Sequence, residues 1–444
     1  MKLNWKKTFP IGFGFLGIMV IWQLYNAFVP LYLQTGHPGF ATSRDVRGFG
    51  LSATSTGAIM GLDNLAAIFI LPLIGFWSDR VRTRIGRRYP FILTAAPLAA
   101  LAFILLPVAA GMIDPGTSGS IVQNQEAFIL FMIGAVLVLL AMAVLRTPVI
   151  SLMPDLIPSP LRSKANGVIN FMGGIGFVIG SFGLAVLFDL DPLYPFLGGA
   201  VILLAAVGLL FLTTKEPPLE DLPRPEDQPA GEEEGAVRAV RQVKVIPREY
   251  RVSLFALLGA IFLLFVAYEG IGTFFTSYAV NELGVSEGVA PTLFGLAGLT
   301  FILFSIPAGY IGERFGRRKT ISAGILLFAG DMVLGYFAVS PLQVGAVLAV
   351  SGLGWALINV NTLPMVIDTT EDQRLLGTYT GLYYLASQIG AAFAPLMLGS
   401  VIDLLGSNYR SIFLSGPAFF LLGLLALSLV TRGEARGGPA AKQA

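Results

Sequence analysis

Long apolar stretches alternate with short polar segments along almost the whole chain. Each stretch holds at least 20 residues, enough for a helix to cross a hydrocarbon layer ~30 Å thick. Backbone groups in lipid must be hydrogen-bonded internally, and the stretches lack the alternating pattern of barrel strands, so we predict helices. The twelve predicted spans cover residues 9–33, 51–76, 90–112, 126–150, 166–188, 193–213, 252–279, 290–312, 320–339, 343–366, 377–402 and 411–431.

One polar segment is much longer than the others and differs from them in composition. Residues 214–251 contain several prolines, an acidic run at 232–234 and then several basic residues. Such a stretch cannot bury enough apolar area to fold, so we expect a partly disordered cytoplasmic linker that serves only as a solvated connection. It divides an N-terminal six-helix bundle at 1–213 from a C-terminal six-helix bundle at 252–431, which a cytoplasmic tail at 432–444 follows.

The composition fits an all-α membrane protein and excludes several other classes. Hydrophobic residues make up 55% of the chain and charged residues only 13%, too few to cover the surface of a soluble protein. The net charge of +2 gives no reason to expect a nucleic-acid partner. The chain has no cysteine, and His37 is its one histidine, which excludes thiol chemistry, Ser-His catalysis and sites built from Cys or several His. We therefore expect no enzyme activity, no cofactor and no metal.

The distribution of Lys and Arg predicts the direction of the spans. If the N-terminus is cytoplasmic, 25 of the 29 basic residues lie in cytoplasmic segments, as the positive-inside rule requires. Both termini are then cytoplasmic. Residues 9–33 lack a small-residue cleavage site, so we interpret this run as a retained span rather than a signal peptide. Short loops and the use of 21 Arg against 8 Lys favour a bacterial plasma membrane.

The loop after the second predicted span reappears after the eighth. The first copy reads GFWSDR at 75–80 and GRRYP at 86–90, and the second reads GYIGERFGRRK from residue 309, which is 234 residues after Gly75. A second repeat relates residues 148–155 and Arg162 to residues 364–368 and Arg374. Two parallel six-span repeats with a binding site at their interface are an architecture of alternating-access carriers.

These motifs resemble the cytoplasmic signature G-x-x-x-D/E-R-x-G-R-R of the major facilitator superfamily, and the resemblance covers nearly the whole chain. The longer form at 75–92 also resembles the sucrose transporters of plants and animals and, more loosely, the melibiose-type glycoside–cation symporters. The resemblance implies twelve helices in two pseudo-symmetric bundles and transport by alternating access. It also implies that a set of charged residues at the cytoplasmic level gates the two halves. These are Asp79, Arg80, Arg84, Arg87, Arg88, Asp155, Glu313, Arg314, Arg317, Arg318 and Asp368. The alternative is that the arginines only anchor loops on the cytoplasmic side.

Four ionisable residues lie well inside predicted spans: Asp63, Arg146, Glu269 and Asp331. A charge at the bilayer centre costs ~2.5–3.5 kcal/mol on insertion scales, so each is a functional candidate. Asp63 lies near mid-depth, where burial favours binding of a proton, and we assign it the coupling role, with a structural hydrogen bond as the alternative. Glu269 is the candidate for a second carboxylate in proton coupling, and the alternative is that it belongs to an outer vestibule. We expect a structural role for Asp331.

Two departures from the related families bear on the coupling ion and the substrate. The sodium-site acids of the melibiose-type symporters correspond to Ala67 and Leu71 here, so the resemblance favours a proton over sodium. The span-4 arginine and acid of the sucrose transporters correspond to Ile150 and Leu139. Arg146 lies one helical turn from Ile150 and is our candidate to bind sugar hydroxyls in its place. The alternative is that the Arg146 side chain extends to the membrane surface.

Sugar hydroxyls are bound by amides, carboxylates and flat aromatic faces. Such groups concentrate on the spans that line the cavity in this superfamily, although Trp and Tyr also favour the membrane interface and Asn also bonds helices together. The candidate substrate-binding residues are Trp22, Gln23, Tyr25, Asn26, Asn64, Arg146, Tyr268, Trp355, Asn359, Asn361, Tyr383 and Gln388.

We predict a secondary active transporter, a monomer in lipid, that imports a sugar or glycoside together with a proton. The first alternative is proton-driven efflux of amphipathic small molecules, because one fold supports transport in both directions. The second alternative is a transport-inactive sensor. Its expected mark is a large ordered cytoplasmic domain, which the composition of residues 214–251 does not supply.

Overall fold

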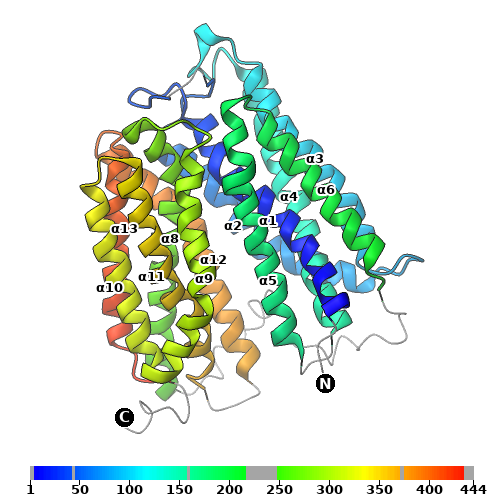
Figure 1. Ribbon diagram of the computed structural model, residues 1–444, viewed down its shortest axis with the longest axis vertical. Helices are drawn as coiled ribbons and strands as arrows, with labels where there is room; N and C mark the ends of the chain where they lie inside the picture. The colour runs from blue at the N-terminus through cyan, green and yellow to red at the C-terminus, as the bar shows by residue number, and fades with distance from the viewer. Residues whose placement is uncertain (1–4, 43–45, 158–160, 217–247, 371–374, 435–444) are drawn as a thin grey trace. The chain divides into compact units, whose positions relative to one another are not determined.

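The computed structural model describes residues 5–42, 46–157, 161–216, 248–370 and 375–434. Twelve long α-helices account for most of these residues, and none of them forms a strand beyond an isolated bridge between Thr83 and Gly86. The predicted all-α fold class is confirmed (Figure 1).

Each long helix overlaps one predicted span. The helices of the first predicted half are α1 (Trp5–Gln34), α2 (Ala53–Arg80), α3 (Tyr89–Gly111), α4 (Gln125–Leu156), α5 (Arg162–Val178) and α6 (Tyr194–Thr213). A π-helical turn at Ile179–Leu184 and a 3-10 turn at Ala185–Asp189 extend α5. The helices of the second half are α8 (Arg248–Leu283), α9 (Ala290–Phe315), α10 (Arg317–Tyr336), α11 (Pro341–Ile367), α12 (Leu376–Leu404) and α13 (Ile412–Ser428).

Among the described residues, eleven helices are long and apolar enough to cross a membrane. Helix α10 is the exception because three basic residues at its start and Asp331 in its middle lower its apolarity. The helices carry large exposed hydrophobic side chains such as Phe69, Leu101 and Ile306, as expected of surfaces that face lipid. The chain is therefore a multi-pass integral membrane protein.

The helices form two compact units that do not coincide with the two halves of the sequence. Unit 1 comprises Met1–Leu51, Phe69–Gln228 and Val285–Gly295, and unit 2 comprises Ser52–Ile68, Pro229–Gly284 and Leu296–Ala444. Each unit thus contains a short segment from the other half of the sequence. These segments are the first part of α2, in unit 2, and the first turns of α9, in unit 1. The boundaries predicted at residues 213 and 252 stay a prediction.

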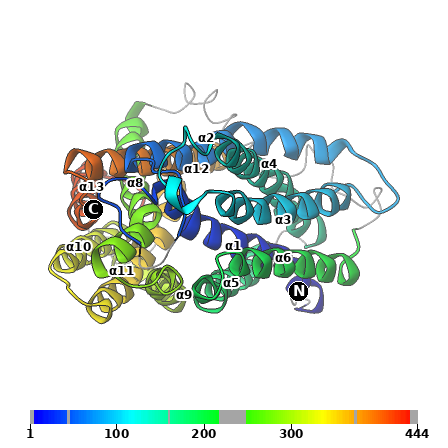
Figure 2. The same cartoon turned by 90° about the horizontal axis from the view of Figure 1, so that it is seen from above.

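Both units are packed through apolar and aromatic side chains. In unit 1, α1 packs against α5 and α6, and α3 packs against α4 and α6 (Figures 1 and 2). The rings of Phe28 and Phe188 stack there with centroids 4.4 Å apart. In unit 2, α8 packs against α12 and α13, and α10 packs against α11 and α13. This packing places the ends of the helices, which carry most of the charged residues described below, next to one another within each unit.

Candidate functional site

The loop between α2 and α3 is a tight turn built on glycine. Gly86 has a φ of 111°, a conformation that other residues rarely adopt. The Thr83 hydroxyl donates to the Gly86 carbonyl at 2.6 Å and closes the turn. A Cβ atom at position 86 would lie 2.4 Å from the carboxyl carbon of Glu216, so no larger side chain fits without a shift. The turn places the next two residues, Arg87 and Arg88, at the start of α3.

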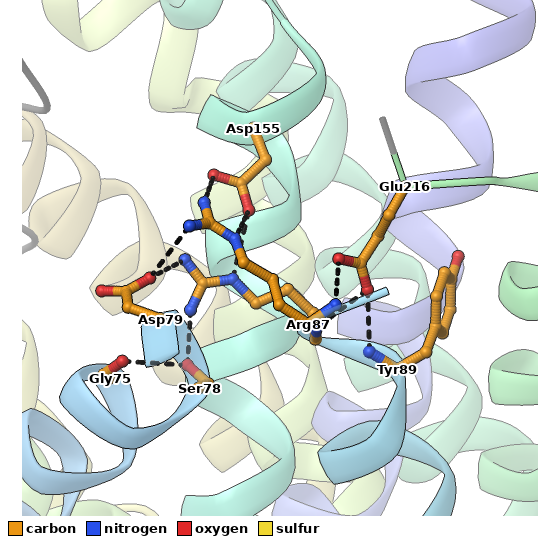
Figure 3. A network of polar contacts seen from close by, with 8 residues as sticks. Gly75, Ser78, Asp79, Arg87, Tyr89, Asp155 and Glu216 are labelled. Carbon is orange, nitrogen blue, oxygen red and sulfur yellow. Dashed lines mark hydrogen bonds and ion pairs between the residues drawn. The ribbon is translucent and has the colours of Figure 1, made fainter. Parts of the chain in front are cut away.

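Arg87 and Arg88 form a buried network with two carboxylates (Figure 3). Asp155 in the last turn of α4 accepts from Arg87 Nη2 at 2.6 Å and from Arg88 Nε at 3.1 Å. Asp79 in α2 lies 2.5 Å from Arg88 Nη2 and 3.6 Å from Arg87 Nη1, and Arg88 also donates to the Ser78 hydroxyl. Only 1% of the Asp155 side chain is exposed. Loss of either carboxylate would therefore leave a guanidinium partly uncompensated in a poorly hydrated place.

Glu216, three residues after the end of α6, covers the first backbone N–H groups of α3. Its Oε2 accepts from Arg87 N, and its Oε1 accepts from Arg88 N and Tyr89 N, all at 2.8 Å. The first N–H groups of a helix have no partner within it, and a negative charge is favourable there. In return, the Tyr89 hydroxyl donates to the Thr214 carbonyl at 2.6 Å, directly after α6. Helices α3 and α6 therefore cap each other.

The same arrangement recurs in unit 2 with fewer charges. Arg317 donates to the Asp368 carboxylate and, at 2.9 Å, to the Pro364 carbonyl. Glu434 after α13 accepts from Arg317 N at 2.7 Å and from Arg318 N at 3.1 Å, at the start of α10. The Arg318 guanidinium in return donates to the carbonyls of Ser428 and Val430 at the end of α13, both at 2.9 Å. Helices α10 and α13 therefore also cap each other.

Four predicted gating residues lie outside these clusters. The Arg80 guanidinium lies over the Phe76 ring, 3.6 Å from its centroid, and the Arg314 guanidinium lies 5.4 Å from the centroid of the Phe315 ring. Arg84 and Glu313 are exposed. None of the four forms an ion pair with a residue in the described ranges. Glu313 therefore does not repeat in unit 2 the pairing that Asp79 has in unit 1.

Sequence reasoning missed four members of the clusters: Ser78, Tyr89, Glu216 and Glu434. The two glutamates fell in the predicted linker, which we expected to be partly disordered, and in the predicted cytoplasmic tail, and neither was a candidate site residue. A signal for them exists in the sequence. In each half, an acid follows the sixth helix within six residues.

An aromatic stack lies inside unit 2 between α8 and α11. The rings of Tyr268 and Trp355 are parallel within 3°, with centroids 4.0 Å apart. Phe265 meets Trp355 edge to face at 5.4 Å. Trp355 is buried, whereas Tyr268 and the adjacent Glu269 are partly exposed. A flat aromatic surface beside a carboxylate suits a ligand that has both an apolar face and hydroxyl groups.

The predicted binding residues of α1 differ in exposure. Trp22 is partly exposed and meets the buried ring of Tyr25 edge to face at 5.8 Å. Gln23 is buried, and its Cβ and Cγ lie 3.0 Å from where a Cβ on Gly180 would be. Asn26 is exposed.

The charged candidates at mid-membrane are only partly described. Asp63 belongs to α2, but its side chain lies outside the described part of the structure. Asn64 and Arg146 are partly exposed, and no ion pair joins Arg146 to a described side chain. Asp331 in α10 accepts from the hydroxyl of the buried Ser351 in α11 at 2.7 Å, a contact between helices of the same unit.

The remaining candidates lie on α11 and α12. The Asn361 amide donates to the carbonyls of Ala308 at 3.1 Å and Leu357 at 2.9 Å, so both of its N–H groups are used within the protein. Asn359 and Gln388 are partly exposed. Tyr383 is buried, and its ring centroid lies 5.2 Å from that of Tyr384.

Known proteins resemble the chain in sequence and in fold. Residues 10–428 match the family described as MFS/sugar transport protein. The drug efflux pump JefA of Mycobacterium tuberculosis is 28% identical over 186 residues, which are 41% of this chain and 35% of that protein. The general alpha-glucoside permease of Schizosaccharomyces pombe is 28% identical over 165 residues, which are 37% of this chain and 28% of that protein. The alignments thus span about a third of the length of these relatives.

A solved structure of the nucleoside transporter NupG superposes with a TM-score of 0.69 at 14% identity and covers 95% of this chain and 100% of that one. At this identity, the likeness bears on the fold alone. The family match over nearly the whole chain confirms the resemblance deduced from the repeated Gly-Arg-Arg loops, and the chain belongs to the family described as MFS/sugar transport protein, within the major facilitator superfamily.

Proposed function

We propose that the protein imports a sugar or glycoside together with a proton, by alternating access. The observation that carries the substrate class is the parallel stack of Tyr268 and Trp355 beside Glu269. A pyranose ring has an apolar face that lies well on an aromatic ring, and its hydroxyls bind carboxylates and amides. The family description and the resemblance to an alpha-glucoside permease support the same class.

We assign proton coupling to Asp63 and Glu269. Both lie inside membrane helices, where a carboxylate needs a partner, a proton or water. Binding of a proton removes the charge and allows substrate to be enclosed in a place from which water is expelled. The same proposal places the protein as a monomer in a bacterial plasma membrane with both termini in the cytoplasm. The arginine clusters then lie on the cytoplasmic side, where we assign them the role of gating residues.

Counterflow uptake in proteoliposomes tests this function directly. Proteoliposomes that contain the purified protein are loaded with one unlabelled saccharide at a time, from a panel of mono- and disaccharides. Uptake of the labelled form of that sugar is then measured at two pH values. We expect uptake of at least one saccharide. Trp355→Ala should lower its apparent affinity about tenfold, because stacking contributes ~0.5–1.5 kcal/mol beyond the apolar area that is lost.

Trp77→Ala is the matched control, because the Trp77 side chain is 51% exposed and lies in the last turn of α2. It should leave the affinity unchanged. Asp63→Asn should retain counterflow but abolish accumulation driven by a pH gradient. Accumulation by Asp63→Asn equal to that of the native protein would contradict the coupling role, and absence of uptake for every saccharide would contradict the substrate class.

Proton-driven efflux of amphipathic compounds is the second candidate, favoured by the resemblance to a drug efflux pump. The aromatic surface that suits a sugar face also suits a planar hydrophobic compound. A thermal-shift comparison of sugars with cationic drugs separates the two candidates. Stabilisation by drugs and not by sugars would favour efflux.

A further inference from the structure

A second repeated motif, separate from the arginine loops, lies at the N-terminal ends of α2 and α9. Gly50, Ser52 and Gly61 correspond to Gly284, Ser286 and Gly295 at the same separation of 234 residues. Gly50 and Gly284 have φ angles of 68° and 62°, a left-handed conformation, and they lie three residues before α2 and six residues before α9. Helix α2 has 28 residues, so its start lies roughly 40 Å from the arginine network at its other end.

Each copy of this motif is held by an aspartate from the other half of the sequence. In unit 2, Asp403 at the end of α12 accepts from Ala53 N at 3.1 Å and Thr54 N at 2.8 Å. In unit 1, Asp189 at the end of the α5 extension accepts from the Ser286 hydroxyl at 2.5 Å and from Gly288 N at 3.0 Å. Asp189 and Asp403 are themselves 214 residues apart, close to the 213 that separate Asp155 from Asp368.

Glycines allow the same helices to approach closely. A Cβ on Gly61 would lie 2.1 Å from the Ala392 carbonyl oxygen of α12. A Cβ on Gly295 would lie 2.7 Å from the Phe182 ring in the α5 extension. Each aspartate therefore completes a tightly fitted contact between one helix of the first half of the sequence and one of the second.

We infer that Asp189 and Asp403 form a two-part latch that must be released during transport. The described ion pairs of the arginine clusters join residues of one sequence half, so a rearrangement of the halves can leave these pairs intact while the clusters gate the cytoplasmic side. The two aspartate contacts join different halves, so a rearrangement of the halves has to break them. The inference rests on the proposed alternating-access cycle, and it assigns the opening step to charge-assisted hydrogen bonds at two helix N-termini.

The absence of native cysteine permits a direct test by thiol labelling. Thr56 near the start of α2 and Ser181 beside Gly295 are fully buried, and neither hydroxyl has a hydrogen-bond partner in the described structure. Thr56→Cys and Ser181→Cys therefore place single thiols next to the two contacts at little cost. The rate of maleimide labelling of the purified protein then reports how often each contact opens.

Asp403→Ala and Asp189→Ala should each speed labelling at both thiols by about tenfold, because each removes a charged acceptor of two hydrogen bonds. Asp191→Ala is the matched control, since the exposed Asp191 accepts from the backbone N of nearby Leu193, and it should change neither rate. If the alanine variants do not fold, the Asn variants, which keep one acceptor oxygen, should show a smaller effect of the same sign.

Unchanged labelling, or faster labelling only at the thiol beside the substituted aspartate, would overturn the inference. The second result would show that each contact opens locally and independently, rather than both contacts opening together. The readout needs no substrate. A failure of sugar uptake therefore contradicts the proposed function without affecting this test, and a failure here leaves the substrate class untouched.

Discussion

The two arginine clusters share one plan but differ in how their charge is balanced. In both units, a glutamate after the sixth helix caps the third, and a side chain from the start of the third helix caps the sixth. Unit 1 adds two carboxylates around two guanidiniums, with 5% or less of the Arg87, Arg88 and Asp155 side chains exposed. Among the described residues, the cluster of unit 2 has one ion pair, between Arg317 and Asp368, whose side chains are 13% and 29% exposed. The mutual capping is thus the common structural element, and the buried charge network is a property of unit 1 alone among the described residues.

The largest difference should follow removal of the carboxylate that both arginines share. Asp155→Asn leaves two buried guanidiniums with one carboxylate and should destabilise the protein by about 3 kcal/mol. Asp368→Asn removes a partly exposed pair and should cost about 1 kcal/mol. Thermal unfolding in detergent measures both. Equal shifts in the two variants would contradict the comparison.

The capping glutamates should give a smaller and more even pair of effects. Glu216→Ala removes the acceptor of three backbone N–H groups and should cost about 2 kcal/mol, whereas Glu434→Ala removes the acceptor of two and should cost about 1 kcal/mol. Gln variants of both should recover part of the loss, because an amide oxygen still accepts. An inert Glu216→Ala variant would show that the contact carries no stability.

The turn glycines test whether the two loops are equally constrained. Both Gly86 and Gly316 have positive φ, at 111° and 97°, so an Ala at either position should cost about 1 kcal/mol from backbone strain. Gly86→Ala should cost more, because the new Cβ also meets Glu216. The double variant Gly86→Ala/Glu216→Ala should cost less than the sum of the single changes, and strict additivity would argue against the steric contact.

The smallest effects are expected at the charged loop residues that lie outside the clusters. Arg84→Ala and Glu313→Ala should shift the unfolding midpoint by less than about 1 °C, since exposed charges contribute little to stability. Both should still be tested for uptake. Impaired uptake without a change in stability would support the gating role proposed for them from the family resemblance.

The sequence predicted the helices well because their cause is local. Twenty apolar residues in a row determine a membrane helix without reference to the rest of the chain, and the repeated loops identified the superfamily. Sequence reasoning also placed Arg87, Arg88, Asp79 and Asp155 at one membrane level, and the structure shows that these four side chains pair. Glu216 and Glu434 were missed because their role depends on which helix ends meet, and composition alone places them in polar segments.

The candidate binding residues are harder to judge from the sequence for a related reason. In the sequence, Asn361 and Trp355 are equally good candidates, because both lie on one predicted span and both residue types bind sugars. In the structure, both amide N–H groups of Asn361 donate to backbone carbonyls, whereas Trp355 stacks on Tyr268. Which side chain is left available is decided by neighbours that are distant in sequence, such as Ala308. The sequence shows which residue types are present, and tertiary packing decides which of them are already bound.

The exchanged aspartate contacts also determine what half of this chain would do if it were made alone. A polypeptide of the first six helices would contain Asp189, the start of α2 and Gly61. It would lack their partners in the full chain, which are Ser286, Asp403 and Ala392. Because the motif is repeated, a second copy of the same fragment would offer both partners at once. The full chain is therefore comparable to a dimer of two similar subunits joined in one polypeptide, because each half supplies the contact partners that the other half needs.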